Sequence, residues 1–187
     1  MSGHTTFRYT AVVAFLICYT TILLGGNVMA SDSGLACPDW PTCHGTLLPA
    51  LAGPTGIEYA HRIAGFLLAV SILFLAILAL VYEARRPVLR KASAAALGLV
   101  VGQALLGGLV VESSLGVGLV LTHLALATAL FGLLLFIAML ANLREIPPHW
   151  IAWLQRASGE EAGRSEPGGL AEAPASGWEA PRAGEAP

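Results

Sequence analysis

Charged residues are scarce in this chain. Asp, Glu, Lys and Arg together make up 12% of its 187 residues, whereas hydrophobic residues make up 56%. A soluble globular protein is about one-quarter charged, so most of this chain is unsuited to contact with water. The net charge of −2 comes without any basic stripe or arm, which argues against nucleic acid as a partner.

The apolar residues gather in four long segments, residues 9–30, 59–82, 92–111 and 117–141. Each segment has about the 20 residues that a helix needs to cross a hydrocarbon core of about 30 Å. Lipid offers no hydrogen bonds, so a segment of this length must satisfy its own backbone as a helix. The sequence therefore predicts an all-α integral membrane protein with four spans, packed as a four-helix bundle.

The first segment has a second interpretation, because Arg8, the apolar run and Val28-Met29-Ala30 resemble a cleavable signal peptide. Its end, Leu23-Leu24-Gly25-Gly26, has a copy at the end of the third segment, Leu105-Leu106-Gly107-Gly108. A signal peptide would not be copied inside the chain, so we expect this segment to remain as a span. The copy also indicates that the bundle consists of two helical hairpins.

Basic residues predict the orientation of the spans, because they favour the cytoplasmic side. The loop between the second and third segments carries Arg85, Arg86, Arg90 and Lys91, whereas residues 29–57 contain neither Lys nor Arg. We therefore expect both termini in the cytoplasm and the loop of residues 31–57 outside the plasma membrane.

The composition changes after residue 142, so we divide the chain into a membrane domain, residues 1–142, and a cytoplasmic remainder, residues 143–187. The remainder begins with a juxtamembrane segment that carries Trp150 and Trp153. From about residue 158 it is rich in Glu, Ala, Gly and Pro, and we expect this tail to be disordered.

Two histidines stand out within the predicted spans. His61 lies a few residues after the start of the second span, and His123 lies about six residues into the fourth. Both spans run inward from the outer side, so both imidazoles should lie within about 10 Å of the outer hydrocarbon edge. Two imidazoles at matched depth in one bundle are suited to hold haem iron from opposite sides.

A small residue follows each histidine by one turn, Gly65 after His61 and Ala127 after His123, and leaves space for a flat macrocycle. The alternative is that each imidazole only makes a hydrogen bond across helices, as we expect of Gln103. Zinc is a weaker interpretation, because no third or fourth ligand lies at that depth. The matched depth favours haem.

Glu58 is three residues before His61 and shares its helical face. A carboxylate there can orient the imidazole or accept protons from a nearby substrate. It can equally be an interfacial residue that pairs with Arg62, and both interpretations stay open.

Two of the three cysteines, Cys37 and Cys43, lie in the predicted outer loop, where a disulfide is permitted. One interpretation is a staple of the loop, and the other is a redox pair that passes electrons to or from the membrane site. Cys18, deep in the first span, is expected to be inert.

Together these residues resemble the haem A synthase family over about residues 20–131. The resemblance rests on Gly25-Gly26, Ser33-Gly34-Leu35-Ala36-Cys37-Pro38-Asp39-Trp40-Pro41, Cys43-His44-Gly45, Glu58-Tyr59-Ala60-His61-Arg62 and Thr122-His123. The Cys-Pro-Asp-Trp-Pro loop together with Glu-Tyr-x-His-Arg is its most specific part.

The resemblance implies an oxidoreductase that converts haem O to haem A by oxidising a porphyrin methyl group to a formyl group. It implies a haem b cofactor, water as the oxygen source, an outside electron acceptor, and a place in terminal oxidase biogenesis. It places the haem ligands at His61 and His123, and we predict Arg62 and Gly65 beside the cofactor from their positions next to His61 on the helix. It gives Glu58 and the pair Cys37 and Cys43 roles in removing protons and electrons.

Typical members of that family have eight spans in two four-helix halves, and compact four-span members are also known. The resemblance therefore implies a homo-oligomer, most simply a dimer, in which two copies replace the two halves. Haem O synthase and terminal oxidase assembly proteins would be its partners. Two rival functions remain: a bis-histidine cytochrome that carries electrons to or from the outer thiols, and a non-catalytic haem-binding assembly factor.

Overall fold

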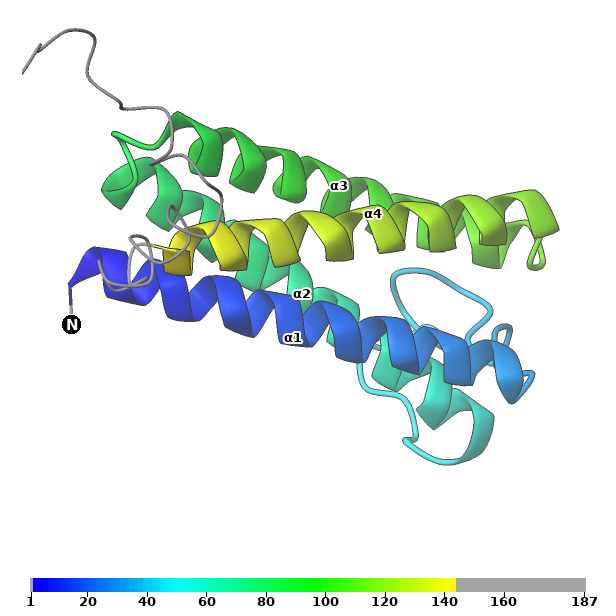
Figure 1. Cartoon of the computed structure of the whole chain (residues 1–187). Helices are drawn as coiled ribbons and strands as arrows, with labels where there is room; N and C mark the ends of the chain where they lie inside the picture. Colours follow the sequence, from blue (N-terminus) through cyan, green and yellow to red (C-terminus); the bar gives the residue numbers. More distant parts are fainter. Residues whose placement is uncertain (1, 144–187) are drawn as a thin grey trace, which may run out of the picture. The chain divides into compact units, whose positions relative to one another are not determined.

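Four long helices make up most of residues 2–143, the part of the chain that the computed structural model describes. They are α1 (Gly3–Ala30), α2 (Gly53–Tyr82), α3 (Pro87–Glu112) and α4 (Val117–Asn142), shown in Figure 1. Each is long and apolar enough to cross a membrane, and the described part contains no strand. The predicted all-α, four-span fold is confirmed. The predicted disordered tail lies outside the described residues.

Three helices begin earlier than predicted, because the apolar pattern marks only the part of a helix that suits lipid; α1 begins at Gly3 instead of residue 9. α2 begins at Gly53 and α3 at Pro87, and each has a proline in its first turn. Proline is favoured there, because the first N–H groups of a helix have no partner within the helix. The loop between α1 and α2 therefore covers residues 31–52 and is shorter than predicted; we call it the disulfide loop.

The four helices form a closed ring in which each helix packs against two others. α1 and α3 both contact α2 and α4, whereas the diagonal pairs, α1 with α3 and α2 with α4, make no close backbone contact within the described residues. Residues on the inner faces of α2 and α4 therefore face each other across the centre of the bundle. Both histidines lie on this diagonal pair.

The apolar core occupies only one half of the bundle, the half that contains the start of α1 and the turn between α2 and α3. Its buried residues run from Phe7 to Cys18, from Leu68 to Ala79, from Leu89 to Val100 and from Leu130 to Ala141. On α4, no residue before Leu130 is buried. The half next to the disulfide loop, which we call the loop half, thus lacks a continuous core.

The repeat predicted from the glycine pairs is present in the structure. At the end of α1, Ser33 N–H donates to the Val28 carbonyl (2.9 Å) and Asp32 adopts φ 52°. At the end of α3, Leu115 N–H donates to the Val110 carbonyl (2.9 Å) and Ser114 adopts φ 53°. Both ends are Schellman caps, offset by the same 82 residues as the glycine pairs. The two hairpins therefore share local geometry as well as sequence.

Candidate functional site

His61 is held by α1. Its Nδ1–H donates to the Thr21 carbonyl at 3.0 Å, since a carbonyl oxygen can only accept. The ring also packs against Gly25, where an added Cβ would lie 3.0 Å from the imidazole Cε1. A proton fixed on Nδ1 leaves the Nε2 lone pair free, which is the state of an imidazole prepared to bind a metal.

His123 lies against the equivalent glycine of the second hairpin. A Cβ added at Gly107 would lie 3.5 Å from the His123 Cε1. The imidazole Nδ1 is buried and has no hydrogen-bond partner. An unsatisfied buried polar atom is rare in proteins and is one sign of a missing ligand.

The two imidazoles occupy matched levels on the diagonal helices α2 and α4. His61 is eight residues from the start of α2 and His123 six residues from the start of α4, or about 12 and 9 Å along the helix axes. They are close enough to influence each other electrostatically. Both lie in the loop half, outside the apolar core.

The loop half fits a flat, largely apolar group better than a packed core. A Cβ added at Gly65, one turn from His61, would meet no atom within 4 Å. The unpartnered Nδ1 of His123 and the unburied face of α4 lie in the same half. The donor set of two imidazoles matches the axial ligation of haem, whereas a structural zinc site needs four ligands.

Glu58 and Arg62 form a buried ion pair that faces the disulfide loop. Glu58 is 4% exposed, its Oε1 accepts from Arg62 Nη2 at 2.5 Å, and its Oε2 accepts from the Cys37 N–H at 2.7 Å. Both carboxylate oxygens are therefore engaged. Glu58 is still near enough to influence His61 electrostatically.

The Arg62 guanidinium binds the backbone of the same loop. Nη1 donates to the carbonyls of Asp39 and Thr42 at 2.7 Å each, and Nη2 also donates to the carbonyl of Cys37 at 2.9 Å. With the bond to Glu58, four of its five N–H groups are in use. Arg62 thus fastens the disulfide loop to the helix that carries His61, and its place beside a cofactor stays a prediction.

Cys37 and Cys43 form a disulfide, with Cα atoms 4.7 Å apart. Both residues are fully buried and pack against Tyr59 of α2, whose hydroxyl donates to the Leu47 carbonyl. Thiol exchange requires access to a sulfur, so this burial protects the disulfide from direct attack. The free cysteine of the described part, Cys18, is buried in the core.

Trp40 connects the disulfide loop to the second hairpin. A Cβ added at Gly108 of α3 would lie 3.0 Å from Trp40 Cδ2, so the indole rests directly on the glycine. Gly108 belongs to the second copy of the glycine pair, in which Gly107 faces His123. The loop is thus fixed to α2 through Arg62 and to α3 through Trp40.

Asp39 organises the tip of the disulfide loop. Its carboxylate accepts from the N–H groups of His44 (2.6 Å) and Gly45 (2.9 Å) and from the Thr42 hydroxyl. The hydrogen bond from Thr42 first, and those from the backbone after it, lower the pKa of Asp39 to about 2. Because this pKa is below that of an unfolded aspartate, about 3.9, ionised Asp39 stabilises the loop above about pH 4. That stabilisation disappears as the pH falls through about 2.

We expect acidification to loosen the loop tip, and Trp40 fluorescence to report it. The fluorescence difference between the parent chain and Trp40→Phe should change between about pH 4 and pH 2. In the Asp39→Asn background, the fluorescence difference with and without Trp40→Phe should already equal that of the acid form at pH 7. It should not change with pH, because an amide does not titrate. Asp32→Asn, an exposed control, should keep the parent profile. A titration in Asp39→Asn like that of the parent would contradict the role of Asp39.

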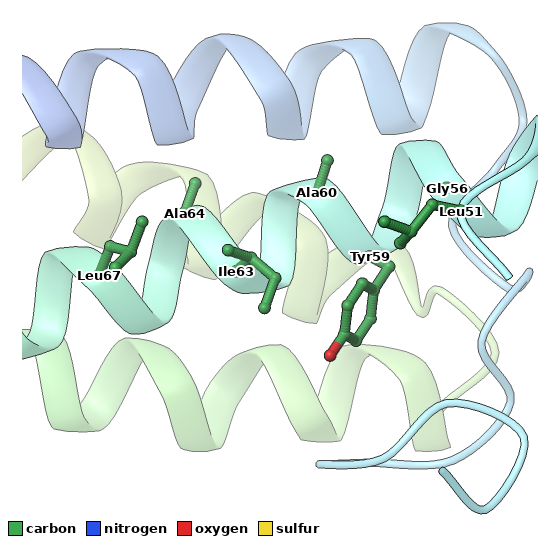
Figure 2. Close-up of a pocket in the computed structure, with 7 residues that line it drawn as sticks. All are labelled: Leu51, Gly56, Tyr59, Ala60, Ile63, Ala64 and Leu67. Atoms are coloured by element: carbon green, nitrogen blue, oxygen red, sulfur yellow. The ribbon is translucent and has the colours of Figure 1, made fainter. Parts of the chain in front are cut away.

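An apolar groove of about 380 Å³ lies along α2 (Figure 2). Its lining residues are Leu51, Gly56, Tyr59, Ala60, Ile63, Ala64 and Leu67. On a helix, Ile63 is turned about 160° from His61, so the groove opens away from the imidazole. It is therefore separate from the histidine site.

Sequence reasoning found both histidines, Glu58, Arg62 and the cysteine pair, and the structure brings all of them to the loop half. The expected hydrogen bond of Gln103 across helices is confirmed, because its Nε2 donates to the His123 carbonyl at 3.0 Å. The part played by Thr21 was missed, because a backbone carbonyl leaves no signal in the residue type. The contacts of Gly25 and Gly107 with the imidazoles were also missed, although the repeat marked these glycines.

Comparison with known families identifies the family of the chain. A family model described as "Cytochrome oxidase assembly protein" (COX15-CtaA) matches residues 8–53 and 53–163, which is most of the chain. The chain belongs to this family. The COX15-CtaA match covers all the site residues described above.

Curated relatives of this COX15-CtaA protein are named "Heme A synthase". The protein of Alkalihalophilus pseudofirmus is 34% identical over 136 residues, 72% of this chain and 45% of the relative. That of Symbiobacterium thermophilum is 36% identical over 134 residues, 70% of this chain and 41% of the relative. That of Halalkalibacterium halodurans is 39% identical over 75 residues, 40% of this chain and 24% of the relative. The chain spans less than half the length of these relatives.

Proposed function

We propose that this chain binds haem between His61 and His123 and acts as a haem A synthase, converting haem O to haem A for terminal oxidase biogenesis. The observation that carries the proposal is the pair of imidazoles on the diagonal helices α2 and α4, in the half of the bundle without an apolar core. Relatives named "Heme A synthase" support the reaction.

The reaction turns a porphyrin methyl group into a formyl group. With water as the oxygen source, the balance is CH₃ plus H₂O giving CHO, four protons and four electrons. The protons must leave the site, and the electrons must pass to an acceptor outside the chain. His61 and His123 would hold haem b, which would supply an iron centre that takes up and releases single electrons.

Glu58 and the cysteine pair support this chemistry from the side of the disulfide loop. Glu58 joins the Cys37 N–H to Arg62, one turn from His61, so a change in the loop reaches the ligand helix directly. We propose that Glu58 handles protons when its bond to Arg62 or to Cys37 opens. Electron removal through Cys37 and Cys43 requires the loop to open as well, because both residues are buried.

We place the protein in the plasma membrane with the disulfide loop outside and both termini in the cytoplasm. The support is the lack of Lys and Arg in residues 29–57 and their concentration around the turn between α2 and α3. We further propose that copies associate, most simply as a dimer that replaces the two halves of an eight-span member. Haem O synthase and terminal oxidase assembly proteins are the proposed partners, since one supplies haem O and the others receive haem A.

One observation favours a second function, a bis-histidine cytochrome or haem carrier without synthase activity. Both oxygens of Glu58 already accept hydrogen bonds, so no carboxylate in the described part of the site is free to take a proton from a substrate. An electron carrier needs only the two ligands and a route to the disulfide.

Pigment extraction separates the two functions. The full chain is co-expressed with a source of haem O in cells that lack haem A, and the extracted haems are separated by chromatography. We expect haem A or its hydroxylated intermediate with the parent chain and neither with His123→Ala. His44→Asn is the matched control, because this histidine is exposed on the disulfide loop, and it should behave as the parent.

Haem O that persists unchanged while the purified chain carries haem b would overturn the synthase and establish the second function. A purified parent chain without any haem would overturn both, since each requires the histidine site.

A further inference from the structure

The two hairpins hold their histidines differently, through residues that occupy equivalent positions of the repeat. The 82-residue offset that relates Gly25 to Gly107 also relates Thr21 to Gln103. Thr21 offers its backbone carbonyl to the ring of His61, whereas Gln103 uses its side chain on the backbone carbonyl of His123. One hairpin therefore fixes the imidazole, and the other fixes only the backbone of its helix.

The bond to Thr21 determines both the tautomer and the rotation of the His61 ring. With the proton held on Nδ1, only Nε2 can act as a ligand, and the ring cannot turn without losing its bond. Such a hydrogen bond also raises the basicity of the ligating nitrogen. Gly25 lets α1 come close enough for this contact.

His123 has no comparable restraint. Its Nδ1 is buried without a partner. Gln103, which occupies the position equivalent to Thr21, donates to the main-chain carbonyl of His123 and not to its ring. An imidazole without a hydrogen bond has no fixed tautomer, and the looser contact at Gly107 leaves its ring freer to turn. The same repeat thus produces one oriented and one unrestrained imidazole.

From this asymmetry we infer that His61 is the anchored axial ligand and His123 the exchangeable one. The inference rests on the haem site of the proposed function and adds an order of ligand strength to it. His61 would keep its hold on haem when the bond from His123 opens. The α4 side is therefore where an external ligand would enter.

The test compares haem retention and carbon monoxide binding in single variants of the full chain, purified with haem b. We expect the parent to be six-coordinate and to bind carbon monoxide poorly. His123→Ala should retain haem and bind carbon monoxide readily in the reduced state. His61→Ala should reduce haem retention by at least about tenfold, because losing a ligand should cost no less than losing the group that orients one.

A matched glycine pair tests the same order without removing a ligand. Gly25→Ala brings a Cβ within 3.0 Å of the His61 ring, which must then move, whereas Gly107→Ala brings one to an ordinary 3.5 Å from His123. Gly25→Ala should shift the haem spectrum and weaken retention more than Gly107→Ala. Because both variants keep both ligands, this comparison remains decisive if His61→Ala does not fold.

Equal haem loss in His61→Ala and His123→Ala, or greater loss in His123→Ala, would overturn the order of strength and leave the haem site standing. If His61→Ala does not fold, a spectral shift in Gly107→Ala as large as that in Gly25→Ala overturns the order by itself. A parent chain that binds no haem would overturn the haem site itself, and the ligand order with it.

Discussion

Arg62→Ala is expected to destabilise the folded chain by about 3–5 kcal/mol, because it leaves the buried Glu58 carboxylate without its counter-ion. The substitution also removes three hydrogen bonds to loop carbonyls. The disulfide loop should then detach from α2, and Cys37 and Cys43 should become exposed. Thermal or denaturant unfolding in detergent measures the loss, and the rate of disulfide reduction measures the exposure.

Removing the uncompensated charge should restore part of this stability. In Arg62→Ala combined with Glu58→Gln, the amide oxygen can still accept from the Cys37 N–H, and no buried charge remains. We expect the double variant to be more stable than Arg62→Ala by about 1 kcal/mol or more, the usual size of coupling between contacting residues. Arg85→Ala, an exposed arginine near the opposite end of α2, should change stability by about 0.5 kcal/mol or less. A loss in Arg62→Ala no larger than in this control would refute the fastening role.

Replacing both cysteines, Cys37→Ala with Cys43→Ala, should lower stability by about 2–3 kcal/mol through the loss of loop closure alone. The bridge closes a segment with a sequence separation of 6. The loop would keep its bonds to Arg62, so we expect a smaller loss of haem binding than in Arg62→Ala. Unfolding in detergent and the haem absorbance of the purified variant give the two measurements.

Cys18→Ala is the control for cysteine content, since this thiol lies in the core away from the disulfide loop.

The parent chain treated with a reductant should lose its disulfide slowly, and Tyr59→Ala should lose it faster, because Tyr59 covers the buried pair. Equal reduction rates in these two proteins would show that Tyr59 does not protect the bridge. Unchanged stability in the double cysteine variant would show that the bridge is not a staple.

Much of the fold could be read from the sequence, because lipid imposes simple rules on it. Long apolar runs must be helices in a membrane, and the Leu-Leu-Gly-Gly copies marked the two hairpins. The same runs placed the start of α2 too late, since Pro54 and its neighbours continue the helix beyond the apolar stretch. Hydropathy reports where lipid begins, whereas helix boundaries depend on caps and prolines.

The site was less predictable, because its main contacts pass through the backbone. Glu58 and His61 share a helical face in the sequence pattern, yet Glu58 binds the Cys37 N–H whereas His61 binds the Thr21 carbonyl. Long-range hydrogen bonds to main-chain atoms are independent of the residue type that supplies the main-chain donor or acceptor. For the same reason, the three bonds of Arg62 to loop carbonyls could not be derived from the sequence, whereas its pairing with Glu58 was one of the two interpretations of that carboxylate.

The one-sided position of the apolar core has a consequence for assembly. The apolar core, which runs from Phe7 to Ala141, can keep the four helices folded before haem binds. Haem could therefore enter the loop half without separating packed side chains. Local opening should be concentrated around α4 upstream of Leu130, and amide exchange should be fastest there in the empty chain. Because the half with the apolar core stays packed while the loop half opens locally, haem could enter and leave without unfolding the bundle.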